Sequence, residues 1–207
     1  MTISLQKKQS ISLSKEAPSV SKFYIACGWQ EQAGIDVDVS AFCCKTGQDG
    51  NPYLFAGPDP YSFLCFFNNT NSPGNGVVHS GDNLSGKNRP ELRGTTAADD
   101  DESIIVDISA LPAEVDEIAI VLTINEATAK RLSFGQVKDC FVRIAENDMT
   151  GRVLASYKPT EDFSAFTSIQ IGSLMRRASG WEFEAVGQGY VADFEQIVGQ
   201  FVDGATA

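Results

Sequence analysis

The sequence is poor in the side chains that bind transition metals. It has one histidine, His79, and none of its five cysteines forms a CxxC pair. A zinc centre needs several such ligands at fixed spacing, so none is expected. The cysteines lie in apolar, strand-like surroundings, which predicts buried free thiols in a reducing compartment rather than a disulfide framework. These cysteines are Cys27, Cys43, Cys44, Cys65 and Cys140.

Basic side chains are also scarce. The 207 residues include 16 Lys and Arg against 27 Asp and Glu, which gives a formal net charge of −11. Nucleic acids and anionic lipid surfaces both require a basic face, so neither is an expected partner. The longest aliphatic run, residues 118–124, is too short to cross a bilayer, and residues 1–18 contain no apolar run typical of a signal peptide. We therefore expect a cytoplasmic protein without direct membrane insertion.

The chain does contain many short β-rich segments separated by turn signals. In residues 35–44, Ile35, Val37 and Val39 alternate with polar residues, which predicts a strand with a polar outer face. Residues 61–67 form a continuous apolar run, which predicts a strand buried on both faces. The other predicted strands are 21–29, 103–109, 117–124, 140–146, 151–158, 166–177 and 180–188, with hairpin turns at "NDMTG" and "ASG".

Helical spacing of apolar residues occurs clearly only in residues 193–201. The whole pattern predicts an all-β fold, an antiparallel β-sandwich with a short C-terminal helix. No Pro/Ser-rich linker divides the chain, so one domain is expected over residues 1–207. Long loops are expected at 45–60 and 84–98.

Carboxylate and amide oxygens gather at four places, all at strand ends or in loops. Calcium takes six to eight such hard oxygen ligands in flexible geometry. The EF-hand pattern does not fit, because "DVDVSAFCC" lacks the glycine and the distal glutamate, so a calcium site would be assembled from distant segments. The candidate ligands are Asp36 and Asp38, Asn68 and Asn69, Asp82 and Asn83, and the acidic run Asp99–Glu102.

Other interpretations of these residues stay open at the level of sequence. The acidic run also suits a solvated loop or a metal-independent module that binds basic partners. "HSGD" places Ser80 and Asp82 close to His79, which allows a hydrolase hypothesis, although catalytic triads are assembled in space rather than from sequence neighbours. Cys43 and Cys44 suit either two core thiols or a site that meets oxidants or tellurite.

Several segments in order resemble the TerD family of tellurium-resistance and stress-response proteins. "GWQ" followed by "GIDVDVSAF" is similar to the family pattern GWD…FDLDASAF. "FFNNTNSPGNGVVHSGDN" is similar to FYNN…SP…V.H.GDN, and "DDESIIVDIS" to DDE…VDLS. "WEFEAVGQGY" and an opening strand pair in residues 3–22 complete a resemblance that covers nearly the whole chain.

This resemblance implies a non-catalytic β-sandwich that binds two neighbouring calcium ions and acts as a calcium-responsive scaffold. Its implied partners are other Ter proteins and a membrane-associated stress complex, which leaves open a peripheral association with the inner membrane. The implied calcium ligands, carried over by motif, are Asp36, Asp38, Asn68, Asn69, Asp82, Asn83, Asp100, Asp101 and Glu102.

The sequence departs from the family pattern near these ligands. Gln30 and Asn125 replace the Asp of GWD and the His of TIH. Residues 84–98 form a longer link than usual between GDN and DDE, and this link carries Lys87, Arg89 and Arg93. Two arrangements are therefore open, namely two intact calcium sites, or one intact and one altered site.

Overall fold

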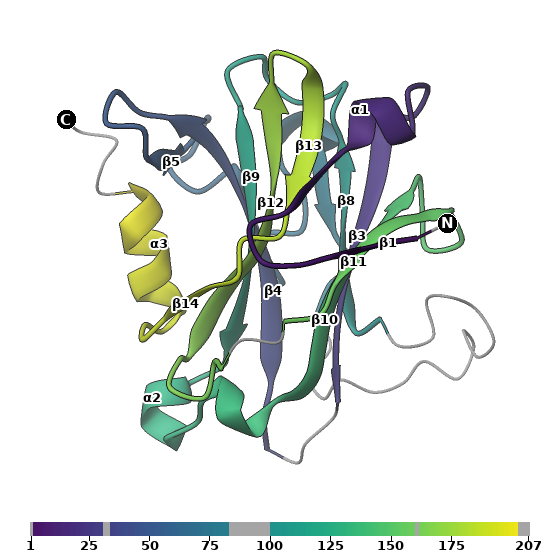
Figure 1. Cartoon of the computed structure of the whole chain (residues 1–207). Coiled ribbons are helices and arrows are strands. Elements are labelled where there is room, and N and C mark those ends of the chain that lie inside the picture. Colours follow the sequence, from purple (N-terminus) through teal and green to yellow (C-terminus); the bar gives the residue numbers. More distant parts are fainter. Residues whose placement is uncertain (1, 31–33, 83–99, 160–161, 203–207) are drawn as a thin grey trace.

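The computed structural model describes residues 2–30, 34–82, 100–159 and 162–202. Its described strands form two sheets, with a C-terminal helix beside one of them (Figure 1). Sheet A has the order β1 (Ile3–Leu5), β11 (Val153–Tyr157), β10 (Lys138–Glu146), β3 (Lys22–Gln30), β8 (Glu102–Asp107) and β7 (Val77–His79). Sheet B has the order β2 (Ser10–Ser12), β13 (Gly180–Glu184), β12 (Ser168–Arg177), β9 (Glu117–Ile124), β4 (Val37–Thr46) and β5 (Pro52–Leu54).

Two short strands extend sheet B, because β14 (Gln188–Tyr190) pairs with β12 and β6 (Leu64–Cys65) pairs with β4. The helical elements are α1 (Leu13–Glu16), α2 (Ala127–Lys130), α3 (Phe194–Val202) and 3₁₀ turns at Pro73–Asn75 and Phe134–Gln136. The predicted all-β sandwich with a short C-terminal helix is confirmed. Both predicted hairpins are present, β10–β11 across "NDMTG" and β12–β13 across "ASG". Gly180 closes the second turn at φ +113°, which a residue with a side chain rarely adopts.

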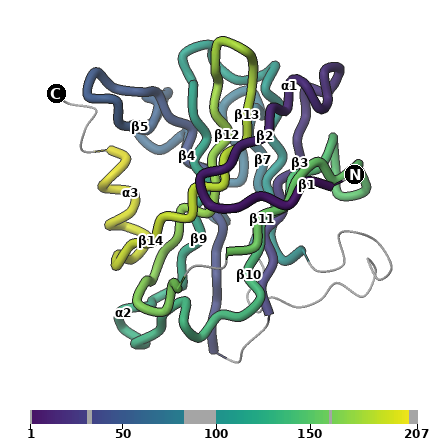
Figure 2. Tube along the Cα trace, in the orientation of Figure 1, coloured from purple at the N-terminus to yellow at the C-terminus, as the bar shows by residue number. Residues whose placement is uncertain are grey.

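The N-terminal segment joins the two sheets. Figure 2 follows the chain from β1 on sheet A, round a turn, to β2 on sheet B. The two opening strands are therefore both present but do not pair with each other. β1 lies parallel to β11, with Ile3 beside Ala155, whereas β2 lies antiparallel to β13. The sandwich is thus antiparallel except at this edge of sheet A.

The interior between the sheets is built by the long central strands. All but the first residue of β9 are buried, as are the first eight residues of β4. The large side chains that are fully buried include Phe23, Ile25, Leu122 and Tyr157. Burial of aliphatic and aromatic surface at about 25 cal/mol per Å² is the main source of stability for such a core. Ten of the thirteen phenylalanines of the sequence lie in this core or pack against it.

Residues 61–67 do not form the long strand expected from their apolar run. Only Leu64 and Cys65 are in a strand, and Tyr61 and Phe67 are 52% and 36% exposed. Turns end the strand on both sides, because the N–H of Leu64 bonds to the carbonyl of Tyr61 and Phe66 pairs with Asn69. Local turn bonding therefore outweighs the apolar pattern in this segment. In the same way, the loop expected at 45–60 contains β5.

The outer face of β4 is covered rather than exposed. The predicted alternation is confirmed, since Val37 and Val39 are in the core. The polar face was expected to be open to solvent, and this is wrong, because Asp38 and Ser40 are 7% and 1% exposed. On the same face, Phe42 stacks on Phe201 of α3 with ring centroids 4.3 Å apart. The apolar side of α3 therefore seals this part of sheet B.

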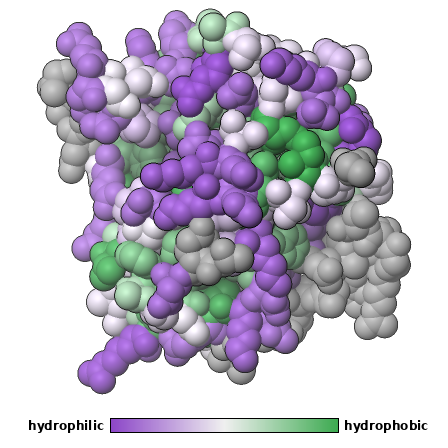
Figure 3. Space-filling model, viewed as in Figure 1, coloured by the Kyte–Doolittle hydropathy of each residue, from purple (hydrophilic) through white to green (hydrophobic). Residues whose placement is uncertain are grey.

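No described helix is long and apolar enough to cross a membrane. On the face shown in Figure 3, hydrophilic side chains predominate and apolar ones show in separate small areas. Scattered apolar atoms are normal on a protein surface and call for no special explanation.

Candidate metal centre

Three of the predicted ligands converge where the start of β4 meets the segment after β7. One carboxylate oxygen from each of Asp36, Asp38 and Asp82 lies within 4.8 Å of the others. Asp36 and Asp38 are two residues apart and so project to the same side of the chain. Asp82 follows Gly81, whose φ of +91° allows the chain to turn after β7. Segments distant in sequence thus form one acidic cluster. This is the kind of arrangement expected once a continuous EF-hand loop is excluded.

Burial and the neighbouring carboxylates both disfavour the charged forms of Asp36 and Asp38. Burial, followed by the charges of Glu102, Asp36 and Asp82, raises the pKa of Asp38 to about 8. Burial also raises the pKa of Asp36, and the hydrogen bond from Asn125 partly opposes this. Asn125 Nδ2 donates to Asp36 Oδ2 over 3.1 Å, whereas Asp36 Oδ1 is buried without a hydrogen-bond partner among the described residues. A divalent cation would relieve the repulsion and bind the free oxygen.

Asp100 lies nearby but is neutralised by an arginine. Arg143 on β10 binds it through two nitrogens, with Nε 2.8 Å from Asp100 Oδ1 and Nη2 on Oδ2. Tyr24 contributes its hydroxyl at 3.3 Å, and the Arg143 guanidinium lies over the Tyr24 ring, 5.2 Å from its centroid. Both charged side chains are almost fully buried, at 6% and 3% exposed. A bidentate pair of this kind satisfies the carboxylate without a metal.

Asp101 and Glu102 bind backbone groups of other strands. Asp101 Oδ2 accepts the N–H of Trp29 and Glu102 Oε2 accepts the N–H of Val39, both at 2.8 Å. The acidic run is therefore not a solvated loop in its described part, because Asp100, Asp101 and Glu102 are all at most 3% exposed. Through these hydrogen bonds the three carboxylates connect the start of β8 to β10, β3 and β4.

Both ring nitrogens of His79 are hydrogen-bonded to backbone groups. Its Nδ1 accepts the N–H of Gly81 at 2.9 Å, so the proton is on Nε2, which donates to the carbonyl of Val39 at 3.0 Å. Glu102 Oε2 lies 3.6 Å from the same Nε2, and both side chains are fully buried. His79 and Glu102 thus satisfy both backbone groups of Val39 on the edge of β4. Neither ring nitrogen is left to act as a base, so the geometry gives the hydrolase hypothesis no support.

Replacing His79 with alanine is expected to lower the free energy of unfolding by about 1–3 kcal/mol, because the buried Val39 carbonyl and Gly81 N–H lose their partner. Urea unfolding at neutral pH would measure this loss. Glu114→Gln, an isosteric change at an exposed site, serves as a control and should leave stability within about 0.5 kcal/mol of wild type. A His79→Ala protein as stable as the control would contradict the structural role.

The asparagines predicted as amide ligands have different surroundings in the structure. Asn68 is exposed, and Asn69 uses its Nδ2 to donate to the carbonyl of Leu64 at 2.7 Å. Asn83, Asp99 and the basic residues of the 84–98 link lie outside the described residues. The assignments of Asn68, Asn69, Asn83, Asp100, Asp101 and Glu102 as calcium ligands therefore stay predictions.

Sequence reasoning missed Arg143 and Tyr24 as partners of Asp100. A signal was present, because Arg143 is the one charged residue within the otherwise apolar "CFVRIA" of a predicted strand. A buried arginine requires an acidic partner, and such a pattern can be searched for. The partner itself, 43 residues away in sequence, is identified only by the fold.

All five cysteines are free thiols, as predicted. Cys27, Cys43, Cys44 and Cys65 are buried, and Cys140 is half-buried. Burial raises the pKa of Cys43 and Cys44 well above the ordinary value. Because the thiolate is the reactive form, these two residues behave as core thiols rather than as a site for oxidants or tellurite.

A comparison with models of known protein families identifies the family of this chain. The model of the TerD domain matches residues 1–201. The chain belongs to the TerD family. Tellurium resistance protein TerD of Serratia marcescens is 36% identical over 205 residues, covering 97% of each chain. General stress protein 16U of Bacillus subtilis (strain 168) is 37% identical over 203 residues, covering 95% of each.

The TerD fold is also found among solved structures. A homologue of telluride resistance protein (TerD) from Streptomyces coelicolor A3(2) superimposes with a TM-score of 0.58 at 16% identity, over 87% of this chain and 96% of that one. This likeness establishes the fold. The family is one of tellurium resistance and general stress response, as the names of the relatives show.

Proposed function

We propose that this TerD-family protein is a non-catalytic, calcium-dependent interaction scaffold in tellurite resistance and general stress response. In this proposal the carboxylates of Asp36, Asp38 and Asp82 hold a calcium ion. The ion neutralises the cluster and orders the segments around it for a protein partner. The names of the relatives support the stress-response role, and the geometry of the acidic cluster supports the metal.

The single observation that carries the proposal is the convergence of three carboxylates within 4.8 Å. The donor set contains oxygens only, which suits calcium rather than zinc or copper. Asp36 Oδ1 is buried and has no hydrogen-bond partner in the part of the chain that the structure describes. Burial and the neighbouring carboxylates raise the pKa of Asp38 and so disfavour its charged form. The residues therefore fit a hard divalent cation. A second ion would need ligands beyond this cluster, and its presence stays a prediction.

The partner and location are part of the same proposal. We take other Ter proteins and a membrane-associated stress complex as the partners, and the cytoplasm, with peripheral attachment to the inner membrane through those partners, as the location. The net charge of −11 favours a basic partner surface over nucleic acid or anionic lipid.

The same charge is the observation that favours a second candidate, an acidic module that binds its partner without metal. The two candidates differ in how capture responds to a chelator. For the scaffold, capture of a Ter-family partner is expected to fall in chelator, whereas for the metal-free module it would be unchanged or stronger.

Thermal unfolding tests the calcium proposal. At calcium near a hundredfold its dissociation constant, binding stabilises the folded state by about 2.7 kcal/mol. For a chain of this size that corresponds to a rise in melting temperature of roughly 5–10 °C over the protein in chelator. Asp36→Asn, which keeps the hydrogen bond from Asn125 but lacks the charge, should lose this rise, and Glu114→Gln should keep it. Equal melting temperatures of the wild type in calcium and in chelator would contradict the proposal.

A further inference from the structure

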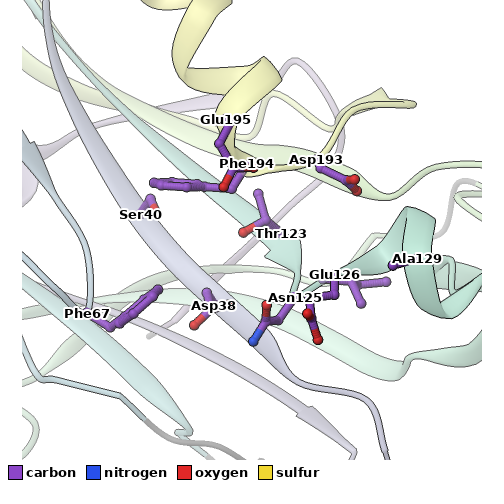
Figure 4. Close-up of a pocket in the computed structure, with 11 residues that line it drawn as sticks. Asp38, Ser40, Phe67, Thr123, Asn125, Glu126, Ala129, Asp193, Phe194 and Glu195 are labelled. Atoms are coloured by element: carbon purple, nitrogen blue, oxygen red, sulfur yellow. The ribbon is translucent and has the colours of Figure 1, made fainter.

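A cavity of about 280 Å³ lies beside the acidic cluster, on the outer face of sheet B. Figure 4 shows its walls, with Asp38 and Ser40 from β4, Thr123 from β9, and Phe194 and Glu195 from α3. Only Asp38 is shared with the cluster. Asn125, which donates to Asp36, also lines the cavity, and the calcium proposal makes no use of the other lining residues.

Ser40 is the first sign that the cavity takes a ligand. Its residue is 1% exposed, and its hydroxyl oxygen is buried with no hydrogen-bond partner among the described residues. It is nevertheless one of the side chains that line the cavity (Figure 4). Buried hydroxyl groups are nearly always paired, so the Ser40 hydroxyl is available to a hydrogen-bonding group held in the cavity.

The charged side chains that line the cavity determine the sign of the charge that a bound ligand can carry. Four carboxylates line the cavity, those of Asp38, Glu126, Asp193 and Glu195, and no lysine or arginine is among the described lining residues. Lys130 pairs with Glu126 at 3.0 Å, and Asp193 Oδ1 accepts the N–H of Thr128. Burial and neighbouring carboxylates raise the pKa of Asp38 to about 8, so Asp38 is mostly uncharged at neutral pH without calcium. Glu195 is exposed and has no cationic partner among the described residues. An anionic ligand would be repelled, whereas a cation is attracted.

The spacing of the carboxylates and the aromatic walls indicate an organic cation rather than a metal ion. Among the described residues, the one group of three or more potential metal ligands within 4.8 Å of one another is Asp36, Asp38 and Asp82, and the other acidic residues of the cavity are not part of it. Phe67 and Phe194 add two aromatic rings to the lining (Figure 4). Aromatic rings attract ammonium and guanidinium groups and pack against alkyl chains.

We propose that this cavity binds a primary ammonium or guanidinium group carried on an alkyl stem. Glu195 supplies the opposite charge, Ser40 accepts a hydrogen bond from the cationic head, and the phenylalanine rings contact the stem. Two sources carry this chemistry, a free alkyl amine or a Lys or Arg side chain of a bound polypeptide. The site differs from the calcium cluster, because Ser40, Glu126, Asp193 and Glu195 line the cavity and are not among the three carboxylates of that cluster.

Backbone NMR of the full chain in chelator tests the site with defined probes. The probes are n-butylammonium with n-butanol as its neutral match, and an acetylated Gly-Gly-Lys-Gly-Gly amide with its norleucine match. Saturable shifts of the Ser40, Thr123 and Phe194 amides are expected with the cations and not with the neutral matches. Tighter binding of the lysine peptide than of n-butylammonium would assign a polypeptide source, and the reverse a free amine. The absence of saturable shifts with both cations, or equal shifts with the neutral matches, would overturn the proposal.

Variants separate this site from the calcium cluster. Glu195→Gln should weaken cation binding by about three- to fivefold, the size of a partly exposed charge pair, and leave calcium binding unchanged. Asp36→Asn should remove calcium binding and leave cation binding within about twofold of wild type, because Asp36 does not line the cavity. Glu114→Gln, at the opposite end of β9 from the cavity, should change neither. Equal weakening by Glu195→Gln and Glu114→Gln would overturn the assignment of Glu195.

Discussion

Replacing Arg143 with methionine is expected to lower the free energy of unfolding by about 3–5 kcal/mol, more than any other single change discussed for this fold. The reason is the state of Asp100 after the change. Its carboxylate is 3% exposed and would lose both nitrogens of the guanidinium. Among the side-chain partners recorded for the described residues, the buried charge would then keep the Tyr24 hydroxyl. A loss of this size is a large part of the stability of an ordinary domain.

A surface ion pair provides the matched control. Arg152 pairs with Glu146, which like Arg143 is a residue of β10, but there the two side chains are 47% and 21% exposed. Arg152→Met should therefore cost no more than about 1 kcal/mol in urea unfolding. The double variant Arg143→Met with Asp100→Asn removes both charges and should recover most of the loss. Equal costs for Arg143→Met and Arg152→Met would show that the buried pair does not anchor β8 to β10.

Replacing Asp38 with asparagine is expected to change stability in opposite directions with and without calcium. In chelator the pKa of Asp38 in the folded protein, about 8, lies above the ordinary value of 3.8. Between these two pH values the folded protein holds a proton that the unfolded chain has lost, so the stability of the metal-free protein falls as pH rises through this window. Asparagine carries no charge, and the variant should therefore be more stable than wild type at pH 8, by on the order of 2 kcal/mol.

In saturating calcium the order should reverse, because the wild type gains the binding free energy of the ion and the variant has lost a ligand. Urea unfolding at pH 8, in calcium and in chelator, measures both signs, and a third series near pH 4 should show little difference between the proteins in chelator. Glu114→Gln should follow wild type in all three series. A variant less stable than wild type in chelator at pH 8 would mean that the cluster is not strained by its own charge.

Much of the fold is predictable from the sequence, because burial follows the local pattern in the central strands. The segment 117–124 shows no alternation of polar and apolar residues and is aliphatic except for Glu117 and Thr123. It forms the buried strand β9 at the predicted residues. Residues 193–201 have helical spacing and form α3 within one residue of the predicted bounds. The failures occur where long-range contacts decide. The sequence of β4 suggests a polar, exposed outer face, yet α3 covers it. No local sequence pattern shows on which strand a helix packs.

The candidate site likewise has a part that the sequence predicts and a part that depends on the fold. Asp36, Asp38 and Asp82 were singled out by residue type and position at strand ends, and the fold brings them together. Asp100 has the same residue type, but Arg143 binds it, and this pairing depends on the neighbouring strands β10, β3 and β8 of sheet A. Oxygen-rich segments can therefore be listed from sequence, whereas only the packed structure shows which carboxylates converge and which one pairs with arginine.

Calorimetric titration of calcium into the metal-free protein tests the central claim most directly. Wild type and Glu114→Gln should both show a saturable binding step, and in Asp36→Asn that step should be absent. Asp36→Asn is decisive because it removes one charge of the cluster and keeps the acceptor for Asn125, so its fold is preserved. Absence of the step from wild type, or its persistence unchanged in Asp36→Asn, would contradict a calcium site formed by Asp36, Asp38 and Asp82.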